Sequence, residues 1–190
     1  MENFKNDIIN ANKVLVAGGL VLYPTDTIWG IGCDATNEAA VERIYALKKR
    51  TDNKAMIVLL DSTARLEQYV KETPDRVYDI VKLSETPITI ICPDGKNLAA
   101  NLLAEDKSIG IRITKEIFSK TLCEVFRRPI VSTSANISGK PSPRLFSEIS
   151  DEIKKGVDYI VAYGQKDTTI KKASSIIRIN VNNTVKIIRK

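Results

Sequence analysis

The chain has 190 residues, of which 43% are hydrophobic and 27% charged, and this ordinary globular composition can bury a core without disulfides or structural metals. No apolar run approaches the roughly 20 residues of a membrane-spanning helix, and the first residues lack the apolar segment of a secretory signal, so we expect a cytoplasmic protein with no membrane partner. The net charge of +6 favours anionic partners such as nucleotides, RNA or phosphorylated metabolites, although solubility alone also explains it.

Helices are predicted by apolar residues at helical spacing and by residues that favour helix starts. The first helix is expected over residues 4–16. Thr36 is expected to cap a helix that runs to about Lys49, and Thr114 to cap a helix that extends to Phe126. The other helical segments are predicted at residues 63–70, 74–83 and 147–155.

Strands are predicted by short runs of β-branched and other apolar residues between turn signals. They are expected at residues 20–23, 28–33, 56–60, 88–92, 109–113, 129–132, 159–162, 175–179 and 185–188. Strands and helices alternate without a linker, a composition break or an internal repeat. We therefore predict one α/β domain over residues 1–190, with a mixed sheet because the last strands follow one another closely.

The densest polar segment is residues 129–143, where a short β-branched strand leads into hydroxyls, an amide and a glycine. Loops that follow buried strands bind ligands in many α/β proteins. Short donors such as Ser134 and Ser142, beside Gly139, suit a phosphate or a carboxylate. The composition by itself favours an ordinary hydrophilic surface loop.

Two further polar segments each have two explanations, ligand binding or a purely structural role. Thr25 and Thr27 follow the strand at 20–23 and can hydrogen-bond a small ligand, or can simply form a turn. Lys48, Lys49 and Arg50 either form a solvated helix end that complements the helix dipole or surround an anion. Lys48 and Arg50 do not share a face of a regular helix, so they converge only if the helix ends between them.

Two polar side chains lie within apolar strands. Thr89 is explained as an ordinary β-branched strand residue. Arg112 requires an anionic partner, and an ion pair with a carboxylate is favoured over a ligand.

The chain contains no histidine, which excludes Ser-His-Asp and Cys-His catalysis and any histidine-ligated metal. Cys33, Cys92 and Cys123 are far apart and odd in number, so they are predicted to be buried thiols, and no metal site is expected. Any catalysis must then depend on Lys, Arg, Asp, Glu, hydroxyls, backbone donors or a metal carried by the substrate, and these residues are compatible with charge stabilisation in transfer at phosphorus.

Taken in order, these segments resemble the YrdC-like family, the threonylcarbamoyl-AMP synthases of tRNA modification. One such motif is weak evidence, but six in the correct order along nearly the whole chain are specific. The matching positions are Tyr23 to Gly32, Lys48 with Arg50, Pro87 with Thr89, Gly110 with Arg112, Ser134 to Gly139, and Ser174 with Ser175.

The resemblance implies a twisted, mixed α/β sheet with flanking helices and a basic concave face. It implies a nucleotidyltransferase that converts L-threonine, bicarbonate and ATP into threonylcarbamoyl-AMP and pyrophosphate, with Mg²⁺ arriving on ATP. The product would pass to a threonylcarbamoyl transferase complex that modifies adenosine 37 of tRNA. The tRNA is a further candidate partner for the concave face.

The resemblance also implies roles for individual residues. The catalytic candidates are Lys48, Arg50, Ser134 and Asn136. The ATP-binding candidates are Arg50, Lys54, Thr89, Ser134, Ser142 and Arg189. The threonine-binding candidates are Thr27, Ser132 and Ser174.

The chain departs from the family pattern at five positions, which puts substrate contacts in its last third in doubt. These are Thr51, Ala55, Pro93, Arg144 and Arg178. A non-enzymatic RNA-binding or ribosome-associated protein of the same fold is the alternative, and the Lys-x-Arg and Ser-x-Asn motifs argue against it. A carbamoyl-adenylate chemistry on another acceptor would need accessory domains, whereas the chain ends at Lys190 and resembles the short family form.

Overall fold

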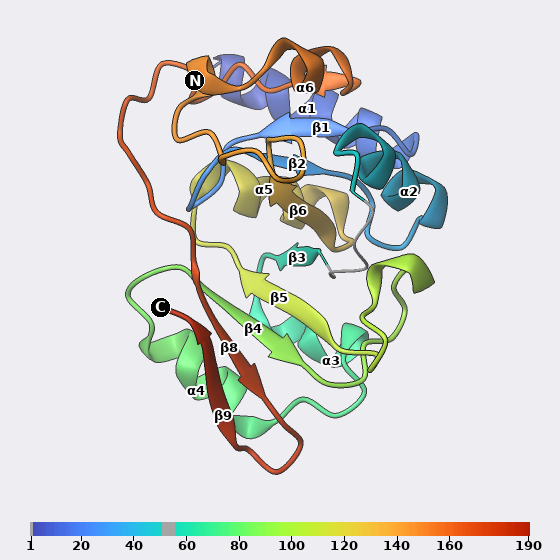
Figure 1. The fold of residues 1–190 in the computed structure, drawn as a ribbon, viewed down its shortest axis with the longest axis vertical. Coiled ribbons are helices and arrows are strands. Elements are labelled where there is room, and N and C mark those ends of the chain that lie inside the picture. The colour runs from blue at the N-terminus through green and yellow to red at the C-terminus, as the bar shows by residue number, and fades with distance from the viewer. Residues whose placement is uncertain (1, 51–55) are drawn as a thin grey trace.

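The computed structural model describes residues 2–50 and 56–190, and within these residues nine strands form one sheet in the order β7-β1-β2-β6-β3-β5-β4-β8-β9. The strands are β1 Val21–Tyr23, β2 Gly30–Gly32, β3 Ile57–Leu60, β4 Ile88–Cys92, β5 Ile109–Ile113, β6 Ile130–Ser134, β7 Tyr159–Ile160, β8 Ser175–Ile179 and β9 Val185–Arg189. Figure 1 shows β8 and β9, in red, at the end of the sheet that lies farthest from helix α1.

The predicted α/β class with a mixed sheet is confirmed. β1 pairs with β7, β3 with β5 and β4 with β8 in parallel, and the other neighbours are antiparallel. Most spatial neighbours are distant in sequence, since β2 pairs with β6 and β4 with β8. The sheet therefore brings the ends of remote segments together.

Helices flank this sheet. They are α1 Glu2–Val16, α2 Glu38–Leu47, α3 Leu66–Tyr69, α4 Asp75–Leu83, α5 Ile117–Phe126 and α6 Asp151–Lys155, with 3₁₀ turns η1 Thr63–Arg65, η2 Ala100–Leu102 and η3 Phe146–Glu148. α1 packs on α5, where the rings of Phe4 and Phe118 meet edge to face with centroids 5.5 Å apart. No helix in the described ranges is long and apolar enough to cross a membrane.

The predicted cap of α2 was wrong by one residue. Asn37, not Thr36, is the N-cap, and its side-chain oxygen accepts from the backbone N–H of Ala40 at 3.1 Å. Thr36 instead turns back toward Asp34, whose Oδ1 accepts from the Thr36 N–H at 2.9 Å and from its hydroxyl at 2.7 Å.

The predicted cap of α5 was also wrong. Glu116, not Thr114, is the N-cap, and its two carboxylate oxygens accept from the N–H groups of Phe118 and Ser119 at 2.9 and 2.7 Å. A carboxylate satisfies two free donors of the first turn at once, and a hydroxyl satisfies fewer.

Several predicted segments differ in extent from the structure. The strands expected at 28–33 and 159–162 are shorter, at Gly30–Gly32 and Tyr159–Ile160. The helix expected at 147–155 is divided into η3 and α6, because Ser150 starts a new helix as its N-cap. The helix expected at 63–70 begins as the 3₁₀ turn η1 before α3. The strand expected at 129–132 continues to Ser134, so three hydroxyls of the polar segment lie on β6.

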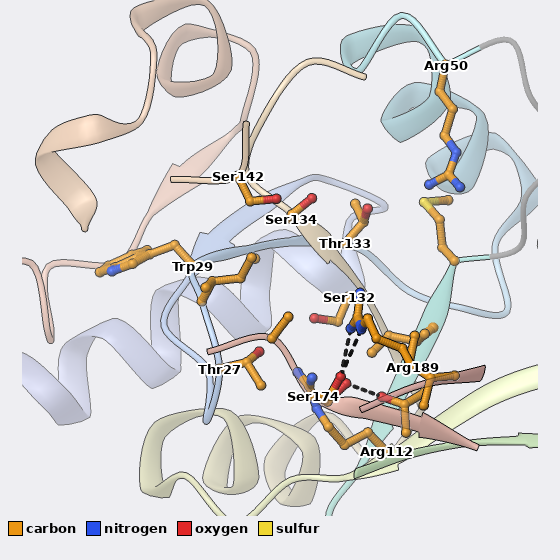
Figure 2. Close-up of a pocket in the computed structure, with 17 residues that line it drawn as sticks. Thr27, Trp29, Arg50, Arg112, Ser132, Thr133, Ser134, Ser142, Ser174 and Arg189 are labelled. Carbon is orange, nitrogen blue, oxygen red and sulfur yellow. Dashed lines mark hydrogen bonds between the residues drawn. The ribbon is translucent and has the colours of Figure 1, made fainter. Parts of the chain in front are cut away.

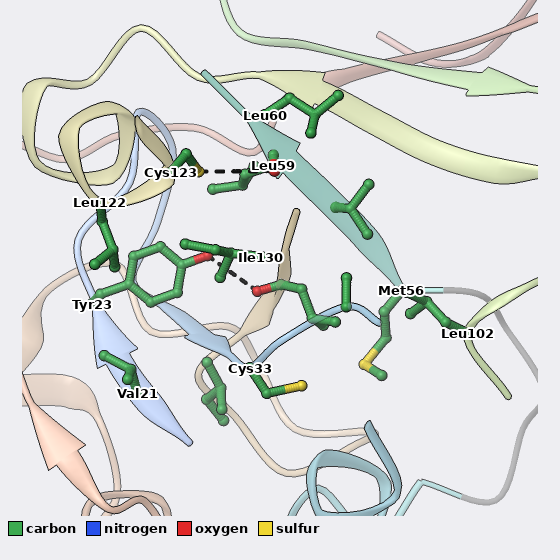
Figure 3. Close-up of a cluster of buried hydrophobic side chains, with 14 of the residues drawn as sticks. Val21, Tyr23, Cys33, Met56, Leu59, Leu60, Leu102, Leu122, Cys123 and Ile130 are labelled. Carbon is green, nitrogen blue, oxygen red and sulfur yellow. Dashed lines mark hydrogen bonds between the residues drawn. The ribbon is translucent and has the colours of Figure 1, made fainter. Parts of the chain in front are cut away.

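The core lies between the sheet and the helices (Figure 3). Tyr23 is fully buried there, and its hydroxyl donates to the backbone oxygen of Val131 at 3.2 Å. Cys33, Cys92 and Cys123 are buried free thiols, as predicted, and burial raises the pKa of each. These thiols are therefore packing residues.

Candidate active site

A cavity of about 210 Å³ opens where β2, β6, β3, β4 and β8 meet the loops that follow them (Figure 2). We call it the central cavity. Eight residues predicted to contact substrates line it: Thr27, Arg50, Thr89, Ser132, Ser134, Ser142, Ser174 and Arg189. Lys54 lies outside the described residues, and Lys48 and Asn136 are not among the lining residues.

The central cavity is strongly cationic. Arg50, Arg112 and Arg189 line it together with seven hydroxyl side chains, and none of its described lining residues is Asp or Glu. Arginine forks and short hydroxyls are donors that suit carboxylates and phosphates. The lining therefore fits anionic ligands.

The end of α2 separates three consecutive cations. Lys49 has a left-handed backbone, with φ of 50°, and the N–H groups of Lys49 and Arg50 donate to the carbonyls of Ala46 and Tyr45. This is a Schellman motif, which ends the helix between Lys48 and Arg50. Lys49 then pairs with Glu152 at 2.6 Å on the surface, while Arg50 reaches the central cavity.

Lys48 is only 2% exposed and points into the protein. Its ammonium donates to the backbone oxygens of Ser134 and Asn136 at 2.5 and 2.6 Å, and its own carbonyl accepts from Ser138 at 2.9 Å. Burial, and secondarily the charge of Arg50, lowers the pKa of Lys48 to about 8. The two polar segments thus meet as predicted, but Lys48 contacts the loop backbone.

The loop after β6 is held in one conformation. The Asn136 amide donates to the carbonyls of Ile137 and Lys140 at 3.0 and 2.7 Å. Its Oδ1 is buried and has no hydrogen-bond partner within the described residues. Buried acceptors are usually satisfied, so this oxygen is available to a donor on a ligand or a water.

Thr27 is fixed by its neighbour. The Thr25 hydroxyl donates to the carbonyl of Ile28 at 2.7 Å and accepts from the N–H of Thr27 at 3.0 Å. The two threonine hydroxyls lie 3.0 Å apart. This network presents the 4% exposed Thr27 to the central cavity.

The far wall of the cavity joins β4 to the C-terminal strands. The hydroxyls of Thr89 and Ser174 lie 2.8 Å apart and are both buried. Arg189 donates from Nε and Nη2 to the carbonyl of Ser174 at 3.1 and 2.8 Å. Residues assigned separately to ATP and to threonine therefore share one wall.

Sequence reasoning gave no substrate contact to two large side chains of the central cavity, Arg112 and Trp29. Arg112 lines the cavity and lies 3.2 Å from Asp26, so the carboxylate partner favoured for it is present. Trp29 lines the cavity and contacts Phe146, with ring centroids 4.8 Å apart. The signal for Arg112 was a charged residue within an apolar strand.

Two of the departures from the family pattern have surface ion-pair partners. Arg144 pairs with Glu148 at 3.2 Å, and Arg178 pairs with Asp106. Both arginines lie outside the lining of the central cavity. Thr51 and Ala55 are not among the described residues.

The fold and this cavity define an α/β protein built to surround anionic groups with arginines and hydroxyls. The Sua5/YciO/YrdC family model, described as "Telomere recombination", matches residues 13–190, and the chain belongs to this family. The resemblance found in the sequence motifs is thus confirmed.

Curated relatives share most of the chain. The threonylcarbamoyl-AMP synthase of Pseudoalteromonas translucida is 34% identical over 160 residues, which cover 83% of this chain and 86% of that protein. The putative threonylcarbamoyl-AMP synthase of Methanocaldococcus jannaschii is 34% identical over 189 residues, which cover 98% and 84%.

Solved structures share the fold. P. abyssi Sua5 in complex with L-threonine matches with a TM-score of 0.81 at 28% identity, covering 90% of this chain and 50% of that one. This chain thus spans about half of that protein. E. coli YciO matches with a TM-score of 0.80 at 26% identity, covering 96% and 88%. Full-length HypF, at 22% identity and a TM-score of 0.81, shows the fold alone.

Proposed function

We propose that the protein is an L-threonylcarbamoyladenylate synthase, a nucleotidyltransferase that forms threonylcarbamoyl-AMP and pyrophosphate from L-threonine, bicarbonate and ATP. The observation that carries this proposal is the central cavity, with three arginines and seven hydroxyl residues but no acidic residue in its described lining. The relatives named threonylcarbamoyl-AMP synthase and the threonine complex of P. abyssi Sua5 support the same substrates.

The reaction requires the three substrates to be brought together and the developing charge to be stabilised, and it requires no enzyme nucleophile. The threonine amine adds to bicarbonate and water leaves, which gives a carbamate. A carbamate oxygen then attacks the α-phosphorus, the new O–P bond forms, and the bond to pyrophosphate breaks. Hydrogen-bond donors held in place by the fold lower the activation barrier of this step, because they orient the reactants and stabilise the charge that develops.

The geometry suggests a division of labour within this proposal. Arg50, Ser134 and Ser142 lie on the side of the cavity formed by α2 and the loop after β6, where they would hold the triphosphate. Thr27, Ser132 and Ser174 would hold threonine, with Arg112 beside its carboxylate. Lys48 would keep the loop in place from behind, through its bonds to the loop backbone.

Mg²⁺ fits this site only as part of the nucleotide complex. No group of three or more His, Cys, Asp or Glu within the described ranges can hold a metal ion, and the lining of the central cavity offers no carboxylate. Phosphate and water oxygens would therefore carry the ion, which usually keeps several waters in such sites. Its role would be to neutralise the phosphate charge.

The product is a mixed anhydride, so a transferase must consume it by passing the threonylcarbamoyl group to an amine acceptor. We propose that this acceptor is tRNA within a separate transferase complex. A basic concave face for direct tRNA contact remains a prediction.

The test is pyrophosphate release from the purified protein with ATP, bicarbonate and Mg²⁺, with and without L-threonine. Threonine-dependent release is expected, and Asn136→Ala should abolish it while the protein stays folded. Absence of release from folded protein would overturn the proposal. Salt-dependent RNA binding without nucleotide binding would then favour the RNA-binding alternative.

A further inference from the structure

Arg112 is a buried arginine with an incomplete set of partners. It lies on β5, is 4% exposed and lines the central cavity. Its Nε lies 3.2 Å from Asp26 Oδ1, yet the two atoms are not aligned for a hydrogen bond, and both are buried without any other partner in the described chain. The guanidinium end points toward Thr27 and Ser174 in Figure 2.

Asp26 approaches this arginine from outside the central cavity. It lies in the loop between β1 and β2, flanked by the hydrogen-bonded Thr25 and Thr27. Its side chain is 9% exposed and borders a second cavity, of about 270 Å³, that Lys115 also lines. Asp26 is not among the residues that line the central cavity, so it acts on a ligand there only through Arg112.

The charges around Arg112 explain why this pair matters. A guanidinium held away from water is costly unless an anion accompanies it, and Asp26 supplies one from the Nε side. Burial lowers the pKa of Arg112, and the second positive charge of Arg189 nearby lowers this pKa further. One carboxylate against two cations leaves a net positive charge for an anionic ligand in the cavity.

The shape of the guanidinium determines what that ligand can be. Its two terminal nitrogens form a planar fork that matches the two oxygens of a carboxylate. The Asp26 carboxylate, 3.2 Å from Nε, favours one orientation of this plane through charge attraction and leaves the fork free. Thr27 and Ser174, which flank the fork, are the residues proposed to hold the amino acid.

We propose that Asp26 is a positioning residue that holds Arg112 by its Nε edge, so that the free fork receives the carboxylate of the amino acid substrate. This inference rests on the proposed function. A positioning role affects threonine binding specifically, whereas a merely structural role affects stability alone.

The first experiment compares Asp26→Asn with the wild-type protein in threonine-dependent pyrophosphate release. We expect the KM for threonine to rise about 10-fold, as for a lost charged contact, with kcat within about 3-fold and the KM for ATP within about 2-fold. A KM for threonine within about 2-fold of wild type would overturn the inference while the proposed function stands. A wild-type protein without threonine-dependent release would instead contradict the proposed function, and with it this inference.

The matched control is Asp34→Asn. Asp34 is also a buried acid paired with an arginine, at 2.7 Å from Arg128 Nη1, and it lies outside the central cavity. We expect this variant to unfold at lower urea concentration and to keep the wild-type KM for threonine. An equal rise in KM for Asp34→Asn would show that loss of stability explains the Asp26 result and would overturn the inference.

A double-variant cycle tests whether Asp26 acts through Arg112. In an Arg112→Gln background, Asp26→Asn should change the KM for threonine by less than about 2-fold, because the residue that it positions is gone. If each substitution raised the KM for threonine by its own factor, and the two factors multiplied in the double variant, the inference would be overturned. If Asp26→Asn fails to fold, Asp26→Glu keeps the charge but displaces it by one methylene, and an unchanged KM in that variant would also overturn it.

Discussion

The ammonium nitrogen of Lys48 lies 2.6 Å from the backbone oxygen of Asn136, which is 88 positions further along the chain. The same ammonium binds the carbonyl of Ser134, so the end of α2 and the loop after β6 form one unit. Because Arg50 and Ser134 both line the central cavity, this unit forms one side of the proposed site.

Lys48→Met is expected to abolish function without unfolding the protein. The variant removes the ammonium that organises the loop, so pyrophosphate release should fall at least about 100-fold. The free energy of unfolding should change by less than about 2 kcal/mol, because removing a buried charge offsets the two carbonyls left unbonded. Pyrophosphate release and urea unfolding measure the two effects.

Lys49→Met is the matched control. Lys49 pairs with Glu152 at the surface, where the side chains are 66% and 51% exposed. Such pairs contribute about 0–1 kcal/mol, so stability and activity should stay near wild type. An equal loss of activity in both variants would contradict the specific role of Lys48.

The lowered pKa of Lys48 predicts an unusual dependence of stability on pH. Its native pKa of about 8 lies below the ordinary 10.5. Below pH 8 both the native and the unfolded states carry the proton, and the cost of burying the charge is fully present. Between pH 8 and 10.5 only the unfolded state keeps the proton, so this cost is relieved as the pH rises.

The measurement compares urea unfolding of the wild type and Lys48→Met at pH 7 and pH 10. From pH 7 to pH 10, the free energy of unfolding of the wild type should rise by up to about 3 kcal/mol relative to that of the variant, since one pKa unit is 1.36 kcal/mol. The comparison cancels the titration of groups common to both proteins. Parallel pH profiles for the two proteins would contradict the lowered pKa.

Gly30 and Gly32 should respond differently to the same substitution, although both lie on β2. A Cβ on Gly32 would lie 2.5 Å from the carbonyl oxygen of Val131 and 2.7 Å from Tyr23 Cε1. Gly32→Ala should therefore destabilise the fold by about 1–3 kcal/mol, the usual cost of overpacking a core. Urea unfolding checks this value.

Gly30→Ala is the companion variant, because Gly30 lines the central cavity. Its Cβ would lie 3.1 Å from Ser132 Oγ, a close contact that a small shift of the hydroxyl can relieve. We expect stability within about 1 kcal/mol of wild type and a raised KM for threonine. A larger loss of stability for Gly30→Ala than for Gly32→Ala would contradict this account of β2.

Thr89→Val should weaken substrate binding through Ser174. The variant keeps the shape of the strand residue but removes the hydroxyl that lies 2.8 Å from Ser174 Oγ. Losing one hydrogen bond at a buried site costs about 1 kcal/mol, and Ser174 becomes free to rotate. We expect a several-fold higher KM for threonine, measured by pyrophosphate release, and a smaller effect of Thr89→Val when Ser174→Ala is already present.

The predicted elements were most accurate where the pattern is local. β4 and β5 have the predicted bounds, because a run of β-branched residues between turn signals depends only on neighbours. The caps of α2 and α5 were misassigned because Asn37 and Glu116 accept from the first-turn N–H groups in place of Thr36 and Thr114, and which side chain reaches those groups depends on three-dimensional geometry.

The site was predictable as a set of residues but not as an arrangement. The order of motifs pointed to Arg50, Ser134 and Ser174, and all three line the central cavity. The sequence did not show that Lys48 binds carbonyl groups, because a lysine ammonium can donate hydrogen bonds either to an anion or to a backbone oxygen.

The sequence alone determined the alternation of strands and helices, the absence of histidine chemistry and the order of polar motifs, since each depends on residue type and local spacing. Only the tertiary structure decided that Asp26 meets Arg112 and that Lys48 meets the loop after β6. The physical reason is the strand order, in which β2 lies beside β6 and β4 beside β8. Hydrogen bonds and ion pairs act over a few ångströms in space, whatever the separation along the chain.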